Sequence, residues 1–102
     1  MRTNAIFNLV FNRKKLELSP EDKSLIQIEI IFTDYKKQYI SSGIYLHPGQ
    51  WDPKNKMVIN DSAAGAINKK LSDLIGTHRT HELRLNELGA SLTRKSVLEC
   101  LG

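Results

Sequence analysis

The sequence predicts an α+β fold, in which a three-stranded antiparallel β-sheet packs against one long C-terminal α-helix. Two patterns carry this prediction. In the first half of the chain, apolar and polar residues alternate, which is the period of a strand with one buried face. In the second half, apolar residues recur every three or four positions, as on one side of a helix. The 102 residues allow one small domain with a single core.

The first predicted strand covers residues 4–12. Because side chains alternate across a strand, Phe7 and Phe11 share one face, and Asn8 and Asn12 share the other. Both faces also carry aliphatic residues. The two phenylalanines favour their own face as the one that packs inward. The two asparagines are then expected to face outward.

Residues 13–24 form a predicted loop that begins with three adjacent cations, Arg13, Lys14 and Lys15. Its Ser-Pro-Glu-Asp segment is typical of a turn. Cations at the end of a strand can rest on nucleic-acid phosphates, but a solvated loop has the same composition. The triplet by itself favours the solvated loop.

A β-hairpin is predicted from two alternating segments, residues 25–32 and 37–46, which are joined by a polar turn. One face collects isoleucines. The other carries amide, hydroxyl, ammonium and phenol groups, with one carboxylate among them: Gln27, Glu29, Lys37, Tyr39, Ser41 and Tyr45. This face can hydrogen-bond to DNA, although an exposed sheet face needs polar residues for solubility alone.

A structured loop is predicted for residues 47–60, with proline turns on both sides of Trp51. A single tryptophan in such a loop is expected to plug the end of a small core, and stacking on a base is the alternative. Lys54 is expected to be exposed and within reach of a phosphate. Residues 57–59 are expected to add a short extended segment.

The long helix is predicted from Asp61 to about Leu88. Asp61 or Ser62 supplies a capping oxygen, and Gly89 suits the left-handed position after the last turn. Thr93 predicts the N-cap of a further helix, residues 94–101. The stripe that should cover the sheet consists of Ala64, Ile67, Leu71, Leu74, Ile75, His78, Leu85 and Leu88.

The composition narrows the function classes. A net charge of +4 permits a nucleic-acid partner without requiring one. The single cysteine excludes an internal disulfide and fits a reducing compartment. No apolar run approaches the roughly 20 residues that span a bilayer. The sequence therefore predicts a soluble, cytoplasmic protein that has no membrane partner.

Catalytic and metal-binding patterns do not stand out. The chain shows no nucleophile–base set, no paired carboxylates and no Gly-rich phosphate loop. His78 and His81 are close in helical spacing, but with His47 they lack the carboxylate or thiol ligands that would complete a metal site. We therefore expect a binding module rather than an enzyme, with no cofactor and no metal.

Three segments occur in an order that is typical of a known family. Ser41–Ile44 has the pattern S-x-G-I, Pro48–Asp52 has P-x-x-W-D, and Ile67–Leu71 has I-N-x-x-L. In this order they resemble the N-terminal arm DNA-binding domain of tyrosine recombinases, the integrases of Bacteroidetes conjugative transposons and related mobile elements. The resemblance covers nearly the whole chain. It departs from the family in the hairpin turn, where Thr33–Lys37 stands in place of a Gly-Lys-Arg-like turn.

The resemblance implies a sheet that lies in the major groove of arm-type DNA sites. It also implies that residues 1–89 form the arm domain, and that residues 90–102 are a linker and the start of a core-binding domain. The partners are then double-stranded DNA, other domains of the same recombinase, and accessory proteins. The catalytic residues of such enzymes belong to a C-terminal domain that has no counterpart in this sequence.

The candidate DNA-binding residues carry polar or cationic side chains. They lie on the polar face of the predicted sheet or in an adjoining loop. Asn8 and Gln27 have the paired donor and acceptor that read adenine, and Lys37 can reach guanine or a phosphate. The hydroxyls suit phosphates. The full set is Asn8, Asn12, Arg13, Lys14, Lys15, Gln27, Lys36, Lys37, Tyr39, Ser41, Tyr45 and Lys54.

Two other functions remain open from the sequence. The first is a protein-interaction module that docks a partner subunit or an accessory factor, which an apolar patch of Ile6, Val10 and Ile31 would favour. The second is the binding of duplex RNA. The central strands lack the aromatic pairs that stack single-stranded bases.

Overall fold

The structure is a computed structural model that describes residues 4–101. Within these residues, the chain forms a three-stranded sheet, a short two-stranded ribbon and two α-helices. The elements are β1 (Ile6–Phe11), β2 (Ser24–Ile31), β3 (Lys37–Leu46), η1 (Pro48–Gln50), β4 (Trp51–Asp52), β5 (Met57–Val58), α1 (Ala64–Glu87) and α2 (Arg94–Leu101).

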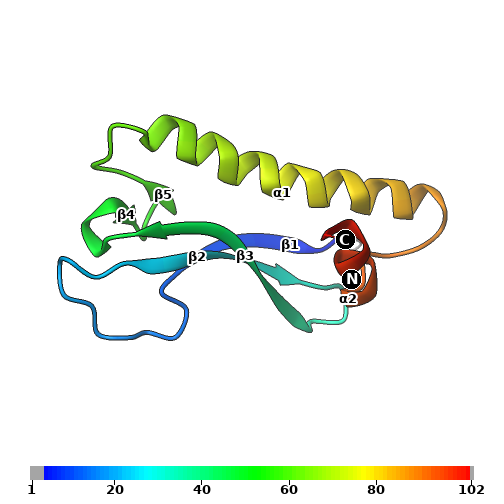
Figure 1. The fold of residues 1–102 in the computed structure, drawn as a ribbon. Helices are drawn as coiled ribbons and strands as arrows, with labels where there is room; N and C mark the ends of the chain where they lie inside the picture. The colour runs from blue at the N-terminus through cyan, green and yellow to red at the C-terminus, as the bar shows by residue number, and fades with distance from the viewer. Residues whose placement is uncertain (1–3, 102) are drawn as a thin grey trace.

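The large sheet is a meander with the strand order β1-β2-β3, and both neighbouring pairs are antiparallel. Helix α1 runs along one side of it (Figure 1). The predicted α+β fold is therefore confirmed. Strand β3 has the predicted bounds, β1 is shorter than the predicted 4–12, and β2 is shifted by one residue from the predicted 25–32.

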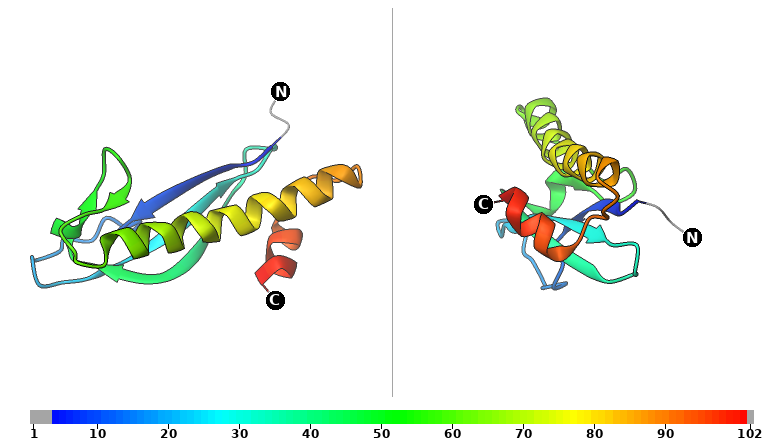
Figure 2. Two further views of the ribbon diagram at one scale, coloured as in Figure 1. Left: turned by 90° about the horizontal axis from the view of Figure 1, so that it is seen from above. Right: turned by 90° about the vertical axis from the view of Figure 1, so that its right-hand side faces the viewer.

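The core lies between the sheet and α1, which stand as two layers in the end view (Figure 2). Ile26, Ile28 and Ile30 of the central strand are completely or almost completely buried on the helix side. Phe7 packs in the same core, which agrees with the prediction that its face of the first strand packs inward. Full burial of an isoleucine contributes roughly 1.5–3 kcal/mol, so this strand holds the two layers together.

Helix α1 begins three residues later than predicted, at Ala64. The Asp61 side chain still satisfies a free amide, because its Oδ1 accepts a 2.7 Å hydrogen bond from the Ala63 N–H. The Asp61 carbonyl accepts a further bond from the Ala64 N–H. Asp61 therefore forms the turn before the helix rather than the predicted cap, and the N-cap residue itself is Ala63.

The apolar stripe of α1 ends before the predicted Leu88, whose side chain is 82% exposed. The chain leaves the helix at this residue, which is the C-cap. Gly89 follows with a φ of +77°, as predicted, and the Ala90 N–H donates to the Leu85 carbonyl at 2.8 Å. This left-handed turn ends the helix. None of the helices in residues 4–101 combines the length and apolarity needed to cross a bilayer.

Trp51 closes the other end of the core, as predicted. Its side chain is buried, and its ring stacks on Phe11 with centroids 6.1 Å apart. The β4–β5 ribbon is fastened to α1 by Asn68, which accepts a bond from the Val58 N–H at 2.8 Å and donates to the Val58 carbonyl at 3.0 Å. The predicted extended segment is strand β5.

Helix α2 begins at Arg94, directly after Thr93, as predicted. The Thr93 Oγ1 accepts from the Ser96 N–H at 3.2 Å, and the Ser96 Oγ accepts from the Thr93 N–H at 2.7 Å. This reciprocal pair is a capping box with serine in the place of glutamate. Leu92 and Val97 flank it and are buried in the same core cluster as Phe32. The segment after Gly89 therefore packs on the sheet.

Two backbone features shape β3. The hairpin turn closes without glycine because Tyr35 adopts a φ of +69°, and the Asp34 side chain accepts a bond from the Lys36 N–H at 3.0 Å. Farther along, Gly43 has a φ of +74° at an irregularity in the pairing with β2. There the buried Ser42 hydroxyl donates a 2.6 Å bond to the Ile26 carbonyl. The sheet bends at this bulge.

Candidate nucleic-acid interface

The face of the sheet that points away from α1, called the open face below, is not covered by either α-helix of residues 4–101 (Figures 1 and 2). The strand register arranges its side chains in three rows. The outer row is Ile6, Ile31 and Lys37; the middle row is Asn8, Glu29 and Tyr39; the inner row is Val10, Gln27 and Ser41.

The middle row is joined by hydrogen bonds across all three strands. The Asn8 amide donates to Glu29 Oε1 at 3.3 Å, and the Tyr39 hydroxyl donates to Glu29 Oε2 at 2.9 Å. Adjacent strands bring opposite residues within reach of each other, and these three side chains fill the width of the sheet. The row therefore holds one carboxylate at the centre of the open face.

Arg13, from the loop after β1, lies over the open face. Its Nε donates to Gln27 Oε1 at 3.0 Å, and its guanidinium lies 4.3 Å from the centre of the Tyr39 ring. A guanidinium over an aromatic face gains a cation–π attraction. Arg13 thus connects the inner row to the middle row, and its remaining N–H groups are available for an acceptor.

The Tyr39 phenol in this network has a pKa above its ordinary value. Its hydrogen bond to Glu29 raises the pKa, and partial burial and the negative charge of Glu29 raise it further. The Arg13 charge acts in the opposite direction and is the smallest of these effects. Tyr39 is therefore a neutral hydrogen-bond donor at physiological pH.

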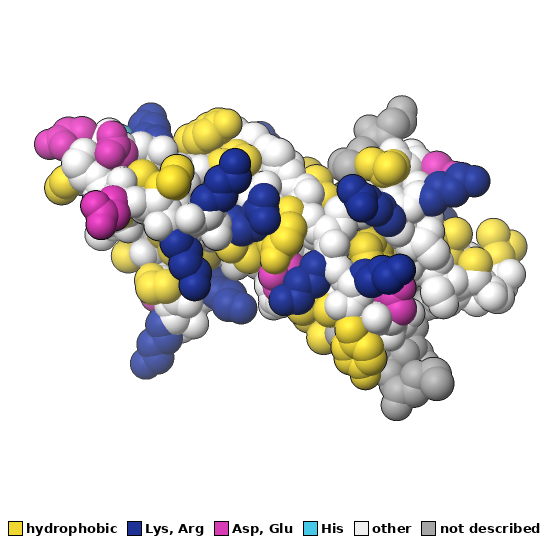
Figure 3. Space-filling model, turned by 90° about the horizontal axis from the view of Figure 1, so that it is seen from below, with side chains coloured by type: hydrophobic (Ala, Val, Ile, Leu, Met, Phe, Trp, Pro, Cys, Tyr) yellow, Lys and Arg dark blue, Asp and Glu magenta, His cyan; other side chains and the backbone are white. Residues whose placement is uncertain are grey.

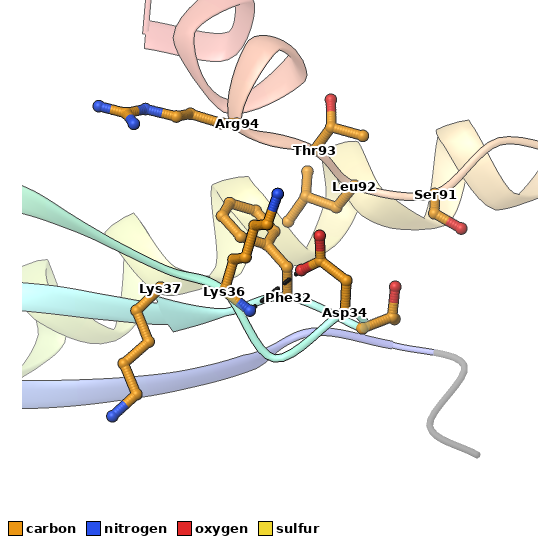
Figure 4. Close-up of a pocket in the computed structure, with 9 residues that line it drawn as sticks. Phe32, Asp34, Lys36, Lys37, Ser91, Leu92, Thr93 and Arg94 are labelled. Atoms are coloured by element: carbon orange, nitrogen blue, oxygen red, sulfur yellow. Dashed lines mark hydrogen bonds between the residues drawn. The ribbon is translucent and has the colours of Figure 1, made fainter.

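The two lysines at the hairpin turn point in different directions (Figure 4). Lys37 belongs to the outer row of the open face and is exposed. Lys36 points toward the start of α2, where a hollow of about 580 Å³ opens between the turn and the segment from Ser91 to Arg94. Of the two, only Lys37 lies on the open face.

The other candidate residues lie in different places. Ser41 and Tyr45 are exposed on β3, and Lys14 and Lys15 are exposed in the loop after β1. Asn12 holds that loop, because its side chain accepts from the Leu16 N–H and donates to the Leu16 carbonyl. Lys54 lies in the turn of the separate β4–β5 ribbon. The sheet brings together the residues of β1, β2 and β3, and the rest lie in the adjoining loops.

The charges are unevenly distributed over the open side of the molecule. Lysine and arginine side chains are spread along its whole length, whereas a group of acidic side chains stands at one end and a few others lie among the cations (Figure 3). A face of this kind attracts a polyanion along its length. Arg94, which lines the hollow with Lys36, adds a cation that the sequence analysis did not select. The sequence could have indicated Arg94, because the predicted N-cap at Thr93 places it in the first turn of α2.

The histidines serve packing and local structure. His81 Nε2 lies 3.1 Å from the Ser96 carbonyl, and His47 Nδ1 lies 3.0 Å from the Asp22 carbonyl, so each has a backbone partner. His78 is buried in the helix–sheet layer, and burial lowers its pKa. Over residues 4–101, no group of His, Cys, Asp and Glu side chains is arranged to hold a metal ion.

Comparison with known proteins assigns the family. A model of the Arm DNA-binding domain family matches residues 10–97, which include the end of β1 and all of β2, β3 and α1. No curated protein and no solved structure matches the chain. The family that the three sequence patterns predicted is therefore confirmed. The chain belongs to the Arm DNA-binding domain family, the non-catalytic DNA-binding module of tyrosine recombinases and integrases.

Proposed function

We propose that this domain binds double-stranded DNA through the open face, as the arm-site module of a site-specific tyrosine recombinase that belongs to a mobile element. The observation that carries the proposal is that α1 covers one face of the sheet, whereas the open face carries polar and cationic side chains. Arg13 supplies charge over the inner and middle rows and Lys37 supplies it in the outer row, with amide and hydroxyl groups beside them.

The dimensions of the sheet suit the major groove of DNA. Neighbouring strands are about 4.8 Å apart, so the two outer strands of a three-stranded sheet are separated by roughly 10 Å. The major groove is about 12 Å wide, and its base edges present both donors and acceptors. The open face offers both kinds of group, because Gln27 retains its NH₂ group and Asn8 retains its carbonyl.

The order of the rows favours DNA over a protein partner. Ile6 and Ile31 lie side by side in the outer row, but Val10 is separated from them by the middle row of Asn8, Glu29 and Tyr39. The three residues therefore do not form the continuous apolar patch that a docking surface needs. Isolated aliphatic groups on such a face are suited to thymine methyl groups instead.

The segment after Gly89 supports a place within a longer recombinase. We propose that residues 90–102 are a linker and the start of a core-binding domain, with Leu92 and Val97 packed in the arm-domain core. Further partners are then the other domains of the recombinase and accessory proteins. Because such an enzyme acts on bacterial DNA, its place of action is the cytoplasm.

The test is a fluorescence anisotropy titration of the chain with labelled duplex DNA, duplex RNA and single-stranded DNA over a series of salt concentrations. Non-specific binding of duplex DNA is expected in the range of roughly 10⁻⁴–10⁻⁶ M. The logarithm of the affinity should fall against the logarithm of salt with a slope of about 0.9 for each phosphate contacted. Tighter binding of duplex RNA, or no salt-dependent binding of duplex DNA, would contradict the proposal.

A further inference from the structure

Glu29 places a carboxylate at the centre of the open face, which is the surface proposed to bind DNA. It lies on the central strand, and its neighbours in the middle row are the uncharged side chains of Asn8 and Tyr39. Within residues 4–101, no lysine or arginine lies within ion-pair distance of its carboxylate. An unpaired negative charge on a DNA-binding face opposes the approach of phosphates, so it needs a compensating interaction.

The carboxylate is held in place and still has capacity to accept. An ionised carboxylate offers about four acceptor positions, and Asn8 and Tyr39 occupy one on each oxygen. These two bonds fix the side chain before any ligand arrives, which reduces the entropy lost on binding. Glu29 is only partly buried. Its free lone pairs can therefore accept a hydrogen bond from a group placed against the open face.

In the major groove, the donors are the N4 amine of cytosine and the N6 amine of adenine. Adenine presents its N7 acceptor next to N6, and guanine and thymine present acceptors, all of which repel a carboxylate. Cytosine presents only the donor. A fixed carboxylate at the centre of the face therefore discriminates in favour of cytosine.

The guanine of the same base pair has a candidate partner. Arg13 stacks on Tyr39, the residue that also binds Glu29, so the cation and the acid are adjacent on the open face. Arginine donates to guanine O6 and N7 through two parallel N–H groups. We infer that Glu29 is a specificity-determining residue that selects a G·C base pair by accepting from cytosine N4, while Arg13 faces the guanine; this inference rests on the proposed function.

The experiment selects duplexes with a randomised centre by binding to the chain and sequences the bound fraction. The wild-type chain should enrich G·C at one position. Glu29→Gln replaces the carboxylate with an amide of the same shape, which reads adenine, so the preference at that position should move to A·T by about tenfold. Glu87→Gln, at an exposed site on α1, makes the same charge change away from the open face and should retain G·C.

A second measurement removes the donor from the DNA. In the selected duplex, the cytosine is replaced by a pyrimidinone base that lacks the N4 amine. The wild-type chain should lose about tenfold in affinity, whereas Glu29→Gln should lose much less, because it no longer depends on that amine. Thermal unfolding of both variants checks that each is folded.

The outcomes separate the inference from the proposed function. If the wild-type chain binds duplex DNA and Glu29→Gln selects the same base pair as the wild type, the inference is wrong and the proposed function stands. Equal losses of the two proteins on the pyrimidinone duplex lead to the same conclusion. If the wild-type chain does not bind duplex DNA at all, both are wrong.

Discussion

The Tyr39 hydroxyl donates a 2.9 Å hydrogen bond to the Glu29 carboxylate across the β2–β3 pair. This bond stabilises the protonated phenol and is the largest reason why the pKa of Tyr39 lies above its ordinary value of about 10. The stability that it contributes is complete below that ordinary value and is lost as the pH rises through the pKa of the folded protein.

Glu29→Gln should therefore lower the pKa of Tyr39 toward its ordinary value. The measurement is an ultraviolet absorbance titration in a chain that carries Tyr35→Phe and Tyr45→Phe, so that Tyr39 is the tyrosine observed. Glu87→Gln in the same background is the control and should leave the titration unchanged. An unchanged Tyr39 titration in Glu29→Gln would show that the bond does not persist in solution.

The burial of Leu92 predicts that the segment after Gly89 contributes to the stability of the whole fold. Leu92 is 3% exposed and packs with the sheet, whereas Leu98 of α2 is 55% exposed. Leu92→Ala should lower the free energy of unfolding by roughly 2–5 kcal/mol. Leu98→Ala should change it by about 0.5 kcal/mol or less. Chemical denaturation measures both, and equal effects would show that this segment is not docked.

Because of His78, the free energy of unfolding should depend on pH. This histidine is buried, its Nδ1 has no hydrogen-bond partner within residues 4–101, and the titratable residues within one turn of it along α1 are Arg79, His81 and Glu82. Burial is the main cause of its lowered pKa, and the charge of His81 adds to it. The unfolded chain therefore binds the proton more tightly than the folded chain does.

The stabilising contribution of neutral His78 is complete above its ordinary pKa of about 6.5 and decreases as the pH falls through the lower pKa of the folded state. His78→Leu should remove this part of the pH dependence of unfolding between about pH 5 and 7. Denaturation at several pH values measures it. His47→Leu, which replaces a histidine in the loop after β3 whose Nδ1 lies 3.0 Å from the Asp22 carbonyl, is the control. The same pH profile in His78→Leu and the wild type would contradict this explanation.

Replacing Gly43 should lower the stability of the fold through the backbone conformation alone. A Cβ at this position would meet no atom within 4 Å, but its φ of +74° is one that other residues rarely adopt. Gly43→Ala should therefore destabilise the protein by about 1–2 kcal/mol. Gly49→Ala also meets open space and has no positive φ, so it should be tolerated. Thermal unfolding of the two variants compares them, and tolerance of both would argue against the bulge.

The sequence predicted the layers of this fold because each depends on a local pattern. The alternation in residues 37–46 predicted the bounds of β3, and the Thr93 signal predicted the start of α2. The end of the apolar stripe at Leu88 was predicted wrongly, since periodicity continues past the point where the helix leaves the sheet. The start of α1 was also displaced, because Asp61 can satisfy a turn as well as a helix cap.

The candidate site was predicted in part. Period two placed Asn8, Gln27, Lys37 and Tyr39 on one face, but it could not show that Glu29 is bonded on both sides, because that depends on the register of three strands. Lys36 was grouped with Lys37 because they are adjacent in sequence. Their side chains point in different directions, and they follow a turn in which Tyr35 has a φ of +69°, which no local sequence pattern encodes.

The most direct test of the account compares two charge-matched double variants in DNA binding. Arg13→Ala with Lys37→Ala removes two cations from the open face, and Lys69→Ala with Lys70→Ala removes two exposed cations from α1 on the other layer. The affinity for duplex DNA is measured for both across a salt series. The open-face pair should weaken binding and reduce the salt slope by roughly 0.9 for each lost phosphate contact, while the α1 pair should change both quantities little. Equal effects of the two pairs, or a larger effect of the α1 pair, would contradict the proposed binding through the open face.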